Sequence, residues 1–170
     1  EIKALNILSN NLLELAQTSV DFADIAQNKI RIDEIVFAAQ NEIKVKYPDK
    51  EIKLHYIKFP DNEDFITVLG NKNLLTAAVK NIIDNACKFS SVNPVKINFD
   101  FDNYYVFLSI IDLGIGINED DLQKIYTPFY RATNAKKVKG KGIGLLMVKK
   151  IIELHKGEID IKSQLDTGTS

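Results

Sequence analysis

The chain begins with a helical pattern of leucines. Residues 1–22 carry one at every third or fourth position, at Leu5, Leu8, Leu12 and Leu15. This spacing puts the leucines on one stripe of a helix and is typical of the a and d positions of a helical bundle. We therefore expect residues 1–22 to be the end of a bundle helix and residues 23–170 to form the domain that follows. An ordinary amphipathic helix packed on its own domain is the alternative, because the pattern covers fewer than three heptads.

A second helix is predicted between Asp33 and Pro48. Asp33 is the expected N-cap, and Ile32 is placed to contact Phe37 across the first turn. Pro48 ends the helix, because proline cannot continue the backbone hydrogen bonding. The apolar residues repeat with the helical period, at Ile35, Val36, Ala39 and Ile43. This pattern indicates a helix with one face on the core.

Alternating apolar and polar residues predict five strands. These strands cover residues 52–56, 65–69, 95–101, 106–110 and 158–162. The third and fourth form a hairpin with one buried face, and the turn lies at residues 102–103. A further helix is expected over residues 142–155. Because strands and helices occur in separate runs, the sequence predicts an α+β fold, a two-layer sandwich of one sheet packed on helices.

The composition suits one domain with a short appendage. Of 170 residues, 45% are hydrophobic and 26% are charged, which is enough for one good core. The formal net charge of -1 provides no overall field for attracting nucleic acid or an anionic membrane, so we predict no nucleic-acid partner. No run reaches the roughly 18 apolar residues of a membrane span. The single Cys87 excludes an internal disulfide, and we expect it to be a small buried residue.

Three polar residues recur at helical spacing within the run 81–89. Asn81, Asn85 and Lys88 lie at i, i+4 and i+7, so they share one stripe of the predicted helix. The other side of the helix is apolar and carries Leu75, Val79, Ile82, Ile83 and Ala86. Amide oxygens suit Mg²⁺ and an ammonium suits phosphate oxygens, so the stripe is a candidate wall of a nucleotide site. Taken alone, it could equally be a solvated helix face.

Two glycine motifs and a basic segment follow this helix. The motif DLGIGI at residues 112–117 comes after a predicted strand, and GKGIGL at residues 140–145 opens a predicted helix. The second is not a Walker loop, because glycine follows Gly-Lys, and it lacks the spacing and the βαβ setting of a dinucleotide fingerprint. Between residues 122 and 152 no acidic residue occurs, and the basic residues are Lys124, Arg131, Lys136, Lys137, Lys139, Lys141, Lys149 and Lys150.

Five motifs in this order resemble those of the GHKL superfamily of ATP-binding proteins, in the version found in sensor histidine kinases. The run 81–89 is similar to the N box, 112–117 to the first glycine box and 140–145 to the second. Residues 128–131, Pro-Phe-Tyr-Arg, are similar to the F box, and Thr-Gly-Thr at 167–169 to the last glycine box. The resemblance implies a Bergerat-type ATP-binding fold with a mostly antiparallel sheet, a mobile basic lid, and a domain that lacks its final strand.

The resemblance implies a site for ATP and Mg²⁺. Asp112 would accept a hydrogen bond from the exocyclic amine of adenine, and Asn85 would bind the metal ion. The implied catalytic residues are Asn81, Lys88 and Arg131. The residues implied to contact the nucleotide are Asn81, Asn85, Lys88, Phe89, Asp112, Gly114, Gly116, Ile117, Phe129, Gly140, Lys141, Gly142, Ile143, Gly144, Leu145 and Thr169. Leu113, where relatives often have Asn, departs from the pattern. Without its partners, Asp-x-Gly would be ordinary turn chemistry.

Asn81 helps to separate kinases from hydrolases within the superfamily. The hydrolases resemble one another in placing Glu at this position, where the carboxylate activates water, whereas an amide cannot act as a general base. Lys88 likewise stands where those relatives usually have an acidic residue. The resemblance therefore implies a protein histidine kinase that transfers the γ-phosphoryl group of ATP. The alternatives are a nucleotide-sensing pseudokinase module, and a GHKL ATPase or anti-sigma-type serine kinase.

The histidine that accepts the phosphoryl group is expected outside this sequence. Neither His55 nor His155 has the His-Glu or His-Asp context of the family's acceptor, and we expect His155 to complement a helix C-terminus. The acceptor would lie upstream of Glu1, on the dimerisation and phosphoacceptor bundle. The implied partners are that bundle and the receiver domain of a response regulator, which takes the phosphoryl group on Asp. The implied setting is a cytoplasmic one, as the cytosolic portion of a homodimeric, membrane-bound sensor.

Overall fold

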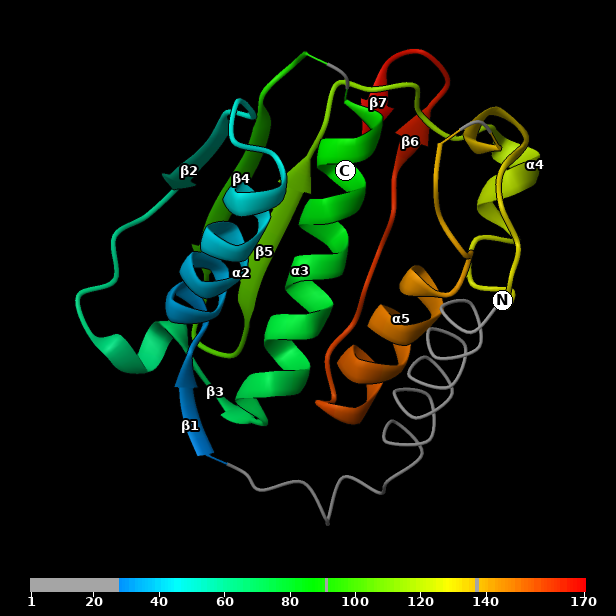
Figure 1. Ribbon diagram of the computed structural model, residues 1–170. Coiled ribbons are helices and arrows are strands. Elements are labelled where there is room, and N and C mark those ends of the chain that lie inside the picture. The colour runs from blue at the N-terminus through cyan, green and yellow to red at the C-terminus, as the bar shows by residue number, and fades with distance from the viewer. Residues whose placement is uncertain (1–27, 91, 137) are drawn as a thin grey trace.

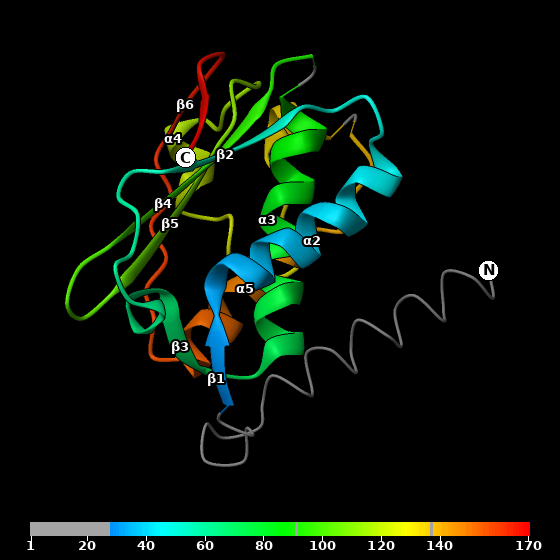
Figure 2. The ribbon, with the colours of Figure 1, turned by 90° about the vertical axis from the view of Figure 1, so that its left-hand side faces the viewer.

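Three helices lie on one face of a three-stranded sheet in the computed structural model, which describes residues 28–90, 92–136 and 138–170 (Figure 1). The helices are α2 (Ile32–Lys46), α3 (Lys72–Phe89) and α5 (Gly144–Leu154), and the strands are β2 (Ile52–Tyr56), β4 (Val95–Phe101) and β5 (Val106–Ile111). Viewed from the side, sheet and helices form two layers (Figure 2). The predicted two-layer α+β sandwich is confirmed. The predicted bundle helix over residues 1–22 lies outside the described residues.

Shorter elements join these layers. β1 (Asn28–Arg31) pairs antiparallel with β3 (Thr67–Gly70), and β6 (Ser163–Gln164) pairs antiparallel with β7 (Gly168–Thr169). The remaining elements are the 3₁₀ helices η2 (Glu63–Ile66) and η3 (Thr133–Ala135) and the short helix α4 (Glu119–Leu122). The strand predicted over residues 65–69 begins only at Thr67, because the residues before it form η2, whose N-cap Asn62 accepts a hydrogen bond from the N–H of Asp64.

The order of the three-stranded sheet is β2-β4-β5, and its strands do not all run the same way. β4 and β5 form the predicted antiparallel hairpin, whereas β2 and β4 are parallel. The chain between β2 and β4 passes through β3 and α3. This long crossover lets β4 run in the same direction as β2, which a short hairpin turn could not do. The sheet is therefore mixed, with its antiparallel part formed by the hairpin.

The core lies between the helices and the inner face of the sheet. The inward residues of β4, Val95, Ile97 and Phe99, are fully buried, which confirms the predicted alternation. On α2 the predicted stripe Ile35, Val36, Ala39 and Ile43 is also buried. On α3 the buried residues are Leu75, Ala78, Val79, Ile83, Ala86 and Cys87, whereas Ile82 is only half-buried. Burial raises the pKa of the Cys87 thiol to about 11, so the thiol is a packed, protonated group at neutral pH.

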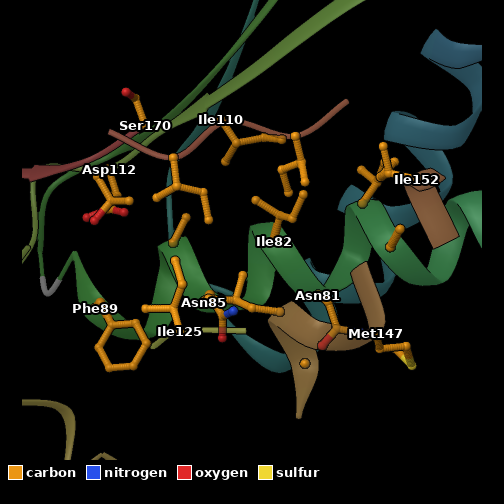
Figure 3. A pocket seen from close by; sticks show the side chains of 18 of the residues that line it. Asn81, Ile82, Asn85, Phe89, Ile110, Asp112, Ile125, Met147, Ile152 and Ser170 are labelled. Carbon is orange, nitrogen blue, oxygen red and sulfur yellow. The ribbon is translucent and has the colours of Figure 1, made fainter. Parts of the chain in front are cut away.

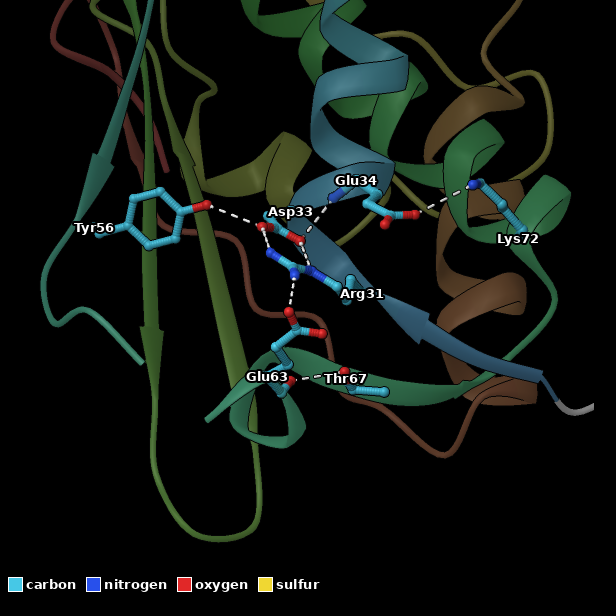
Figure 4. A network of polar contacts seen from close by, with 7 residues as sticks. All are labelled: Arg31, Asp33, Glu34, Tyr56, Glu63, Thr67 and Lys72. Atoms are coloured by element: carbon cyan, nitrogen blue, oxygen red, sulfur yellow. Dashed lines mark hydrogen bonds and ion pairs between the residues drawn. The ribbon is translucent and has the colours of Figure 1, made fainter. Parts of the chain in front are cut away.

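The start of α2 differs from the prediction. The N-cap is Arg31, and the prediction of Asp33 as N-cap was wrong. Asp33 lies inside the first turn, where its carboxylate is bound by the Arg31 guanidinium at 2.8 Å and the Tyr56 hydroxyl at 3.3 Å (Figure 4). Arg31 also forms an ion pair with Glu63 at 2.8 Å. The hydrogen bond from Arg31 lowers the pKa of Asp33. The charge network therefore connects α2 to β2 and η2. The Asp33 carboxylate takes part in this network instead of capping the helix.

The strand predicted over residues 158–162 is also not formed. Hydrogen bonding of the β6–β7 pair continues outward only to Lys162 and Ser170, which exchange two backbone bonds of 2.8 Å. In the β6–β7 register Ser163 lies opposite Thr169 and Lys162 opposite Ser170, so Ile161 has no opposite residue among those described. The segment is extended, but it has no partner strand among the described residues, so its alternation alone does not make it part of a sheet.

Within the part of the chain that the structure describes, no helix combines the length and the apolar character needed to cross a membrane.

Candidate functional site

A large cavity opens beside α3, between this helix, the sheet and the segments that lead into α5 and β6 (Figure 3). Its volume is about 1580 Å³, above the roughly 300–1,000 Å³ of typical small-molecule sites. Apolar side chains form much of the wall, among them Ile82, Ile110, Ile125 and Met147. The polar groups gather along α3 and at the end of β5. The cavity can therefore hold a large ligand that has both an apolar part and charged groups.

The predicted polar stripe of α3 forms one wall of this cavity. Asn81, Asn85 and Lys88 all line it. The Nδ2 of Asn81 donates to the carbonyl oxygen of Ala77, one turn back, at 3.1 Å. On the other side of the amide, a Cβ atom at Gly144 would lie 2.7 Å from the Asn81 Oδ1. The start of α5 therefore lies so close to α3 that any side chain larger than that of glycine at position 144 would displace the Asn81 amide oxygen.

Lys88 forms an ion pair behind this wall. Its Nζ lies 2.5 Å from Oδ2 of Asp84, one turn back on α3. Oδ1 of the same carboxylate lies 2.5 Å from Nζ of Lys46, the last residue of α2. Burial acts to raise the pKa of Asp84, but the hydrogen bonds and charges of the two lysines outweigh it, so the pKa is lowered. Asp84 is thus an ionised group between two cations.

Asp112 is a buried carboxylate just beyond the end of β5, with 7% of its surface exposed. Its Oδ1 accepts a hydrogen bond from the N–H of Gly114 at 2.9 Å. Its backbone N–H donates to the Thr169 oxygen at 2.9 Å, and the Thr169 N–H donates to the Asp112 oxygen at 3.1 Å. Burial raises the pKa of Asp112, and the Gly114 amide offsets part of this. The result is a hydrogen-bond acceptor held in a fixed position at the edge of the cavity.

The loop between α4 and α5 supplies a further wall. Arg131 donates from Nη2 to the carbonyl oxygen of Ala135 at 2.6 Å and to that of Val138. Asn134 donates from Nδ2 to the carbonyl oxygen of Gly116 at 2.9 Å. These bonds fold the first part of the loop on itself and tie it to the first glycine motif. Near its end, Gly142 has a φ of 74°, which favours glycine.

Asp121 on α4 anchors the start of this loop. Its carboxylate accepts from the Tyr130 hydroxyl at 2.5 Å and from the Thr133 N–H at 3.1 Å. These two bonds lower the pKa of Asp121. Arg131 lies between the two anchored residues, so its backbone is held on both sides.

Nearly all predicted site residues line this one cavity. Two do not: Gly114, which packs against the Phe89 carbonyl, and Phe129, whose side chain is 63% exposed. The members on the wall are Asn81, Asn85, Lys88, Phe89, Asp112, Gly116, Ile117, Arg131, Gly140, Lys141, Gly142, Ile143, Gly144, Leu145 and Thr169. Sequence reasoning missed Asp84, Asp121 and Asn134. Only Asp84 had a local signal, because it stands four residues before Lys88 on a predicted helix.

A profile of the family described as histidine kinase-, DNA gyrase B-, and HSP90-like ATPase matches residues 70–170 of the chain. Over 189 aligned residues the chain is 25% identical to the autoinducer 2 sensor kinase/phosphatase LuxQ of Vibrio parahaemolyticus, covering 100% of this chain and 21% of the relative. The chain thus spans about a fifth of the length of that relative.

Solved structures of sensor kinases share the fold. The mycobacterial sensor histidine kinase MprB superposes with a TM-score of 0.71 at 23% identity, covering 84% of this chain and 92% of that one. Full-length ShkA, solved in complex with AMPPNP, superposes with a TM-score of 0.76 at 20% identity, covering 98% of this chain and 34% of that one. At these identities the likeness establishes the fold alone.

Proposed function

Because the chain belongs to the family of histidine kinase-, DNA gyrase B- and HSP90-like ATPases, we propose that it is the ATP-binding catalytic domain of a two-component sensor histidine kinase. The observation that carries this proposal is that Asp112 and the stripe of Asn81, Asn85 and Lys88 line one cavity. Phe89, next to Asp112, and Asn81 are separated by about 12 Å along the axis of α3, at 1.5 Å per residue. That length suits a nucleotide lying along the helix, with its base near Asp112 and its phosphates near the asparagines. The Lys88 side chain reaches back one turn toward Asn81, to Asp84, so its ammonium lies on the phosphate side of Phe89.

The adenine end is supported by the environment of Asp112. Its fixed carboxylate can accept from an exocyclic amine, which discriminates between bases because guanine presents an oxygen at the corresponding position. The apolar side chains Ile110 and Ile125 line the same cavity and can contact the faces of the ring. We assign the base-binding role to Asp112, with Gly116, Ile117 and Thr169 beside it.

The phosphate end has the donor set that suits Mg²⁺. The Oδ1 of Asn81 is not used by the hydrogen bond to Ala77, and Asn85 lines the cavity beside it. Amide oxygens and phosphate oxygens are hard ligands of the kind that Mg²⁺ takes. We propose that Asn85 binds the ion and that Asn81 assists. The ion, when bound, neutralises charge on the phosphates.

Cations for the phosphates come from both walls. Lys88 lies on α3, Arg131 lies in the loop, and Lys139 and Lys141 also line the cavity. Positioning and charge neutralisation are the main contributions that a protein makes to phosphoryl transfer. Asn81 in place of a carboxylate supports transfer over hydrolysis, because an amide cannot remove a proton from water. We propose that Lys88 and Arg131 stabilise the transferring phosphoryl group.

The acceptor is proposed to be a histidine of a separate dimerisation domain. Of the two histidines of this chain, His155 uses both ring nitrogens in hydrogen bonds, to the Asn71 N–H and the Ile151 carbonyl. His55 is exposed on β2, next to the inward-facing Leu54 and Tyr56 and so on the outer face of the sheet. In the transfer, the acceptor nitrogen bonds to the γ-phosphorus and loses a proton, and the bond from that phosphorus to the β-phosphate oxygen breaks, leaving ADP. A response regulator receiver domain would then take the phosphoryl group. We further propose a cytoplasmic location within a homodimeric, membrane-bound sensor.

Calorimetric titration of the 170-residue chain with ATP and with AMPPNP, with and without Mg²⁺, tests the nucleotide site. We expect micromolar binding that Mg²⁺ strengthens, and absence of binding by the folded chain would overturn the proposal. The kinase assignment is tested by joining the chain to its upstream bundle and assaying with radiolabelled ATP. Acid-labile phosphohistidine supports it, phosphoserine would identify a serine kinase, and release of phosphate alone would identify a hydrolase.

A further inference from the structure

We propose that Asp84 is a positioning residue that holds the Lys88 ammonium in the free site and competes for it with the phosphates of the nucleotide. This inference rests on the proposed function, because it concerns the affinity of the same site for ATP. Asp84 would therefore weaken the binding of the triphosphate, and its removal would tighten that binding.

The placement of the two residues relative to the cavity is the first observation. Lys88 and Lys46 both line the cavity, whereas Asp84, which lies between them, does not belong to its wall. The Lys88 Nζ is 2.5 Å from Asp84 Oδ2, and the exposed fractions of the two side chains are 23% and 17%. The Lys88 ammonium is therefore held by a carboxylate that does not line the space where phosphates would lie. To bind a phosphate oxygen, the ammonium has to leave the carboxylate or share itself between the two anions.

The second observation is that Asp84 has another cation. Lys46 at the end of α2 contacts Oδ1, the oxygen that Lys88 does not use, at 2.5 Å. If Lys88 were the only cation beside Asp84, its departure would leave a largely buried carboxylate unpaired. That loss would strongly destabilise the protein and keep Lys88 in place. Because Lys46 contacts the other carboxylate oxygen, Lys88 can leave without uncovering an unpaired charge. The Lys46–Asp84 ion pair thus allows Lys88 to exchange the Asp84 carboxylate for a phosphate of the nucleotide.

The exchange predicts a preference that depends on the charge of the ligand. A triphosphate offers Lys88 more negative charge than a diphosphate, so ATP displaces Asp84 more effectively than ADP does. Since the pair is largely shielded from water, the competition is screened by salt less than a surface ion pair would be. Asp84 therefore affects the ATP-to-ADP affinity ratio as well as the affinity itself.

The test is calorimetric titration of the full 170-residue chain with MgATP and MgADP. Asp84→Asn keeps the shape of the side chain and removes its charge. We expect it to tighten ATP binding about threefold to fivefold, the range of a modest ion pair, and ADP binding by less. Lys88→Met should weaken ATP binding. In the Lys88→Met background, Asp84→Asn should change nothing, because the competition needs both residues.

A matched control separates this effect from a general loosening of the two helices. Lys80 of α3 also forms an ion pair with Glu42 of α2, and neither residue lines the cavity. Glu42→Gln therefore removes an α2–α3 ion pair without touching the site, and it should leave both affinities unchanged. If Asp84→Asn unfolds the chain, Asp84→Ser supplies a second neutral side chain.

The outcomes distinguish the inference from the proposed function. If the folded parent binds no ATP, both fail. If the parent binds ATP but Asp84→Asn leaves the affinity unchanged or weakens it, only the inference fails. It fails also if the tightening persists in the Lys88→Met background, because the effect would then be a general change in the electrostatic field. Tightening that requires Lys88 supports the inference.

Discussion

The ring of His155 links the end of α5 to the start of α3, because its Nε2 accepts a hydrogen bond from the backbone N–H of Asn71 at 3.0 Å. A backbone N–H can only donate, so Nε2 carries no proton, and Nδ1 is the nitrogen that donates to the Ile151 oxygen at 2.7 Å. Asn71 is itself the N-cap of α3 and accepts hydrogen bonds from the N–H groups of Asn73 and Leu74. One neutral histidine tautomer thus joins the helix that carries the polar stripe to the helix that opens at Gly144.

We expect His155→Ala to lower the free energy of unfolding by about 1–2 kcal/mol, because the N–H of Asn71 and the carbonyl oxygen of Ile151 both lose a partner. Urea denaturation of the parent and the variant measures the difference. His55→Ala is the control, since His55 is an exposed strand residue, and it should change the stability by less than about 0.5 kcal/mol. Equal stabilities of parent and His155→Ala would refute the structural role of this ring.

The close approach of α5 to Asn81 predicts different effects for two glycines of the same motif. Gly144→Ala places a methyl group 2.7 Å from the Asn81 Oδ1, so the amide or the helix has to move. We expect this variant to weaken MgATP binding about tenfold or more, because the displaced Oδ1 is the atom proposed to assist Mg²⁺ binding. Gly140→Ala is the comparison within the same motif: Gly140 also lines the cavity, but nothing lies within 4 Å of its Cβ position, so its loss of affinity should be clearly smaller. Similar affinities of the two variants in titration calorimetry would contradict this geometry.

Asp112→Asn should change affinity and stability in opposite directions. The amide cannot reproduce a double acceptor, so ATP affinity should fall about tenfold or more. Burial raises the pKa of Asp112, so the ionised carboxylate reduces stability once the pH rises through that pKa. The variant should therefore be at least as stable as the parent at pH 7, and this advantage should shrink as the pH falls and Asp112 is protonated. Both readouts come from one set of samples, by calorimetry and by urea denaturation.

The control for Asp112→Asn is Asp100→Asn on β4. Asp100 lies outside the cavity wall, where its carboxylate is 3.6 Å from Lys58. This variant should bind ATP as the parent does. A loss of stability in Asp112→Asn that matches its loss of affinity would show that the carboxylate is structural and would remove the argument for base recognition.

The network around Asp33 predicts acid sensitivity. Its pKa in the folded chain lies below the ordinary value of 3.8, chiefly through the Arg31 hydrogen bond. The stabilisation is therefore complete above that ordinary value and is lost as the pH falls through the lower, folded-state pKa. We expect Asp33→Asn to lose about 2 kcal/mol of unfolding free energy at pH 7, and the difference from the parent to shrink in strong acid. Urea denaturation over a pH series measures both effects.

Glu34→Gln provides the comparison within the same helical turn. Glu34 pairs with Lys72 at 3.4 Å, and both side chains are more than half exposed (Figure 4). An exposed pair of this kind contributes at most about 1 kcal/mol and is screened by salt. The variant should therefore differ little from the parent at any pH. A loss as large as that of Asp33→Asn would mean that burial of the carboxylate is not the cause.

The elements that the sequence predicted well are those whose pattern repeats locally. The helical spacing of Asn81, Asn85 and Lys88 and the alternation along β4 depend only on backbone geometry, which is the same in every helix and strand. The buried faces of α2 and β4 follow from the same periodicities. The roles of the site residues stay predictions, because geometry alone does not show what they bind.

The errors came from interactions between distant parts of the chain. Asp33 has the local signature of an N-cap, but Arg31 and Tyr56 bind its carboxylate instead. Residues 158–162 alternate like a strand, yet pairing depends on a second segment that sequence spacing does not identify. The anchoring of Tyr130 by Asp121 joins α4 to a loop that carries no regular pattern, so nothing local predicted it. Such contacts become visible only in three dimensions.

The pairing of Asp112 with Thr169 has a consequence for how the protein is made. The backbone of Asp112 is held by Thr169, a residue that leaves the ribosome after it. The helix with the asparagine stripe and the first glycine motif can therefore leave the ribosome while the proposed base-binding end is still unsupported. If Asp112 binds the base as proposed, the emerging chain would complete that end of the site only when the segment containing Thr169 has been translated and has folded back onto Asp112.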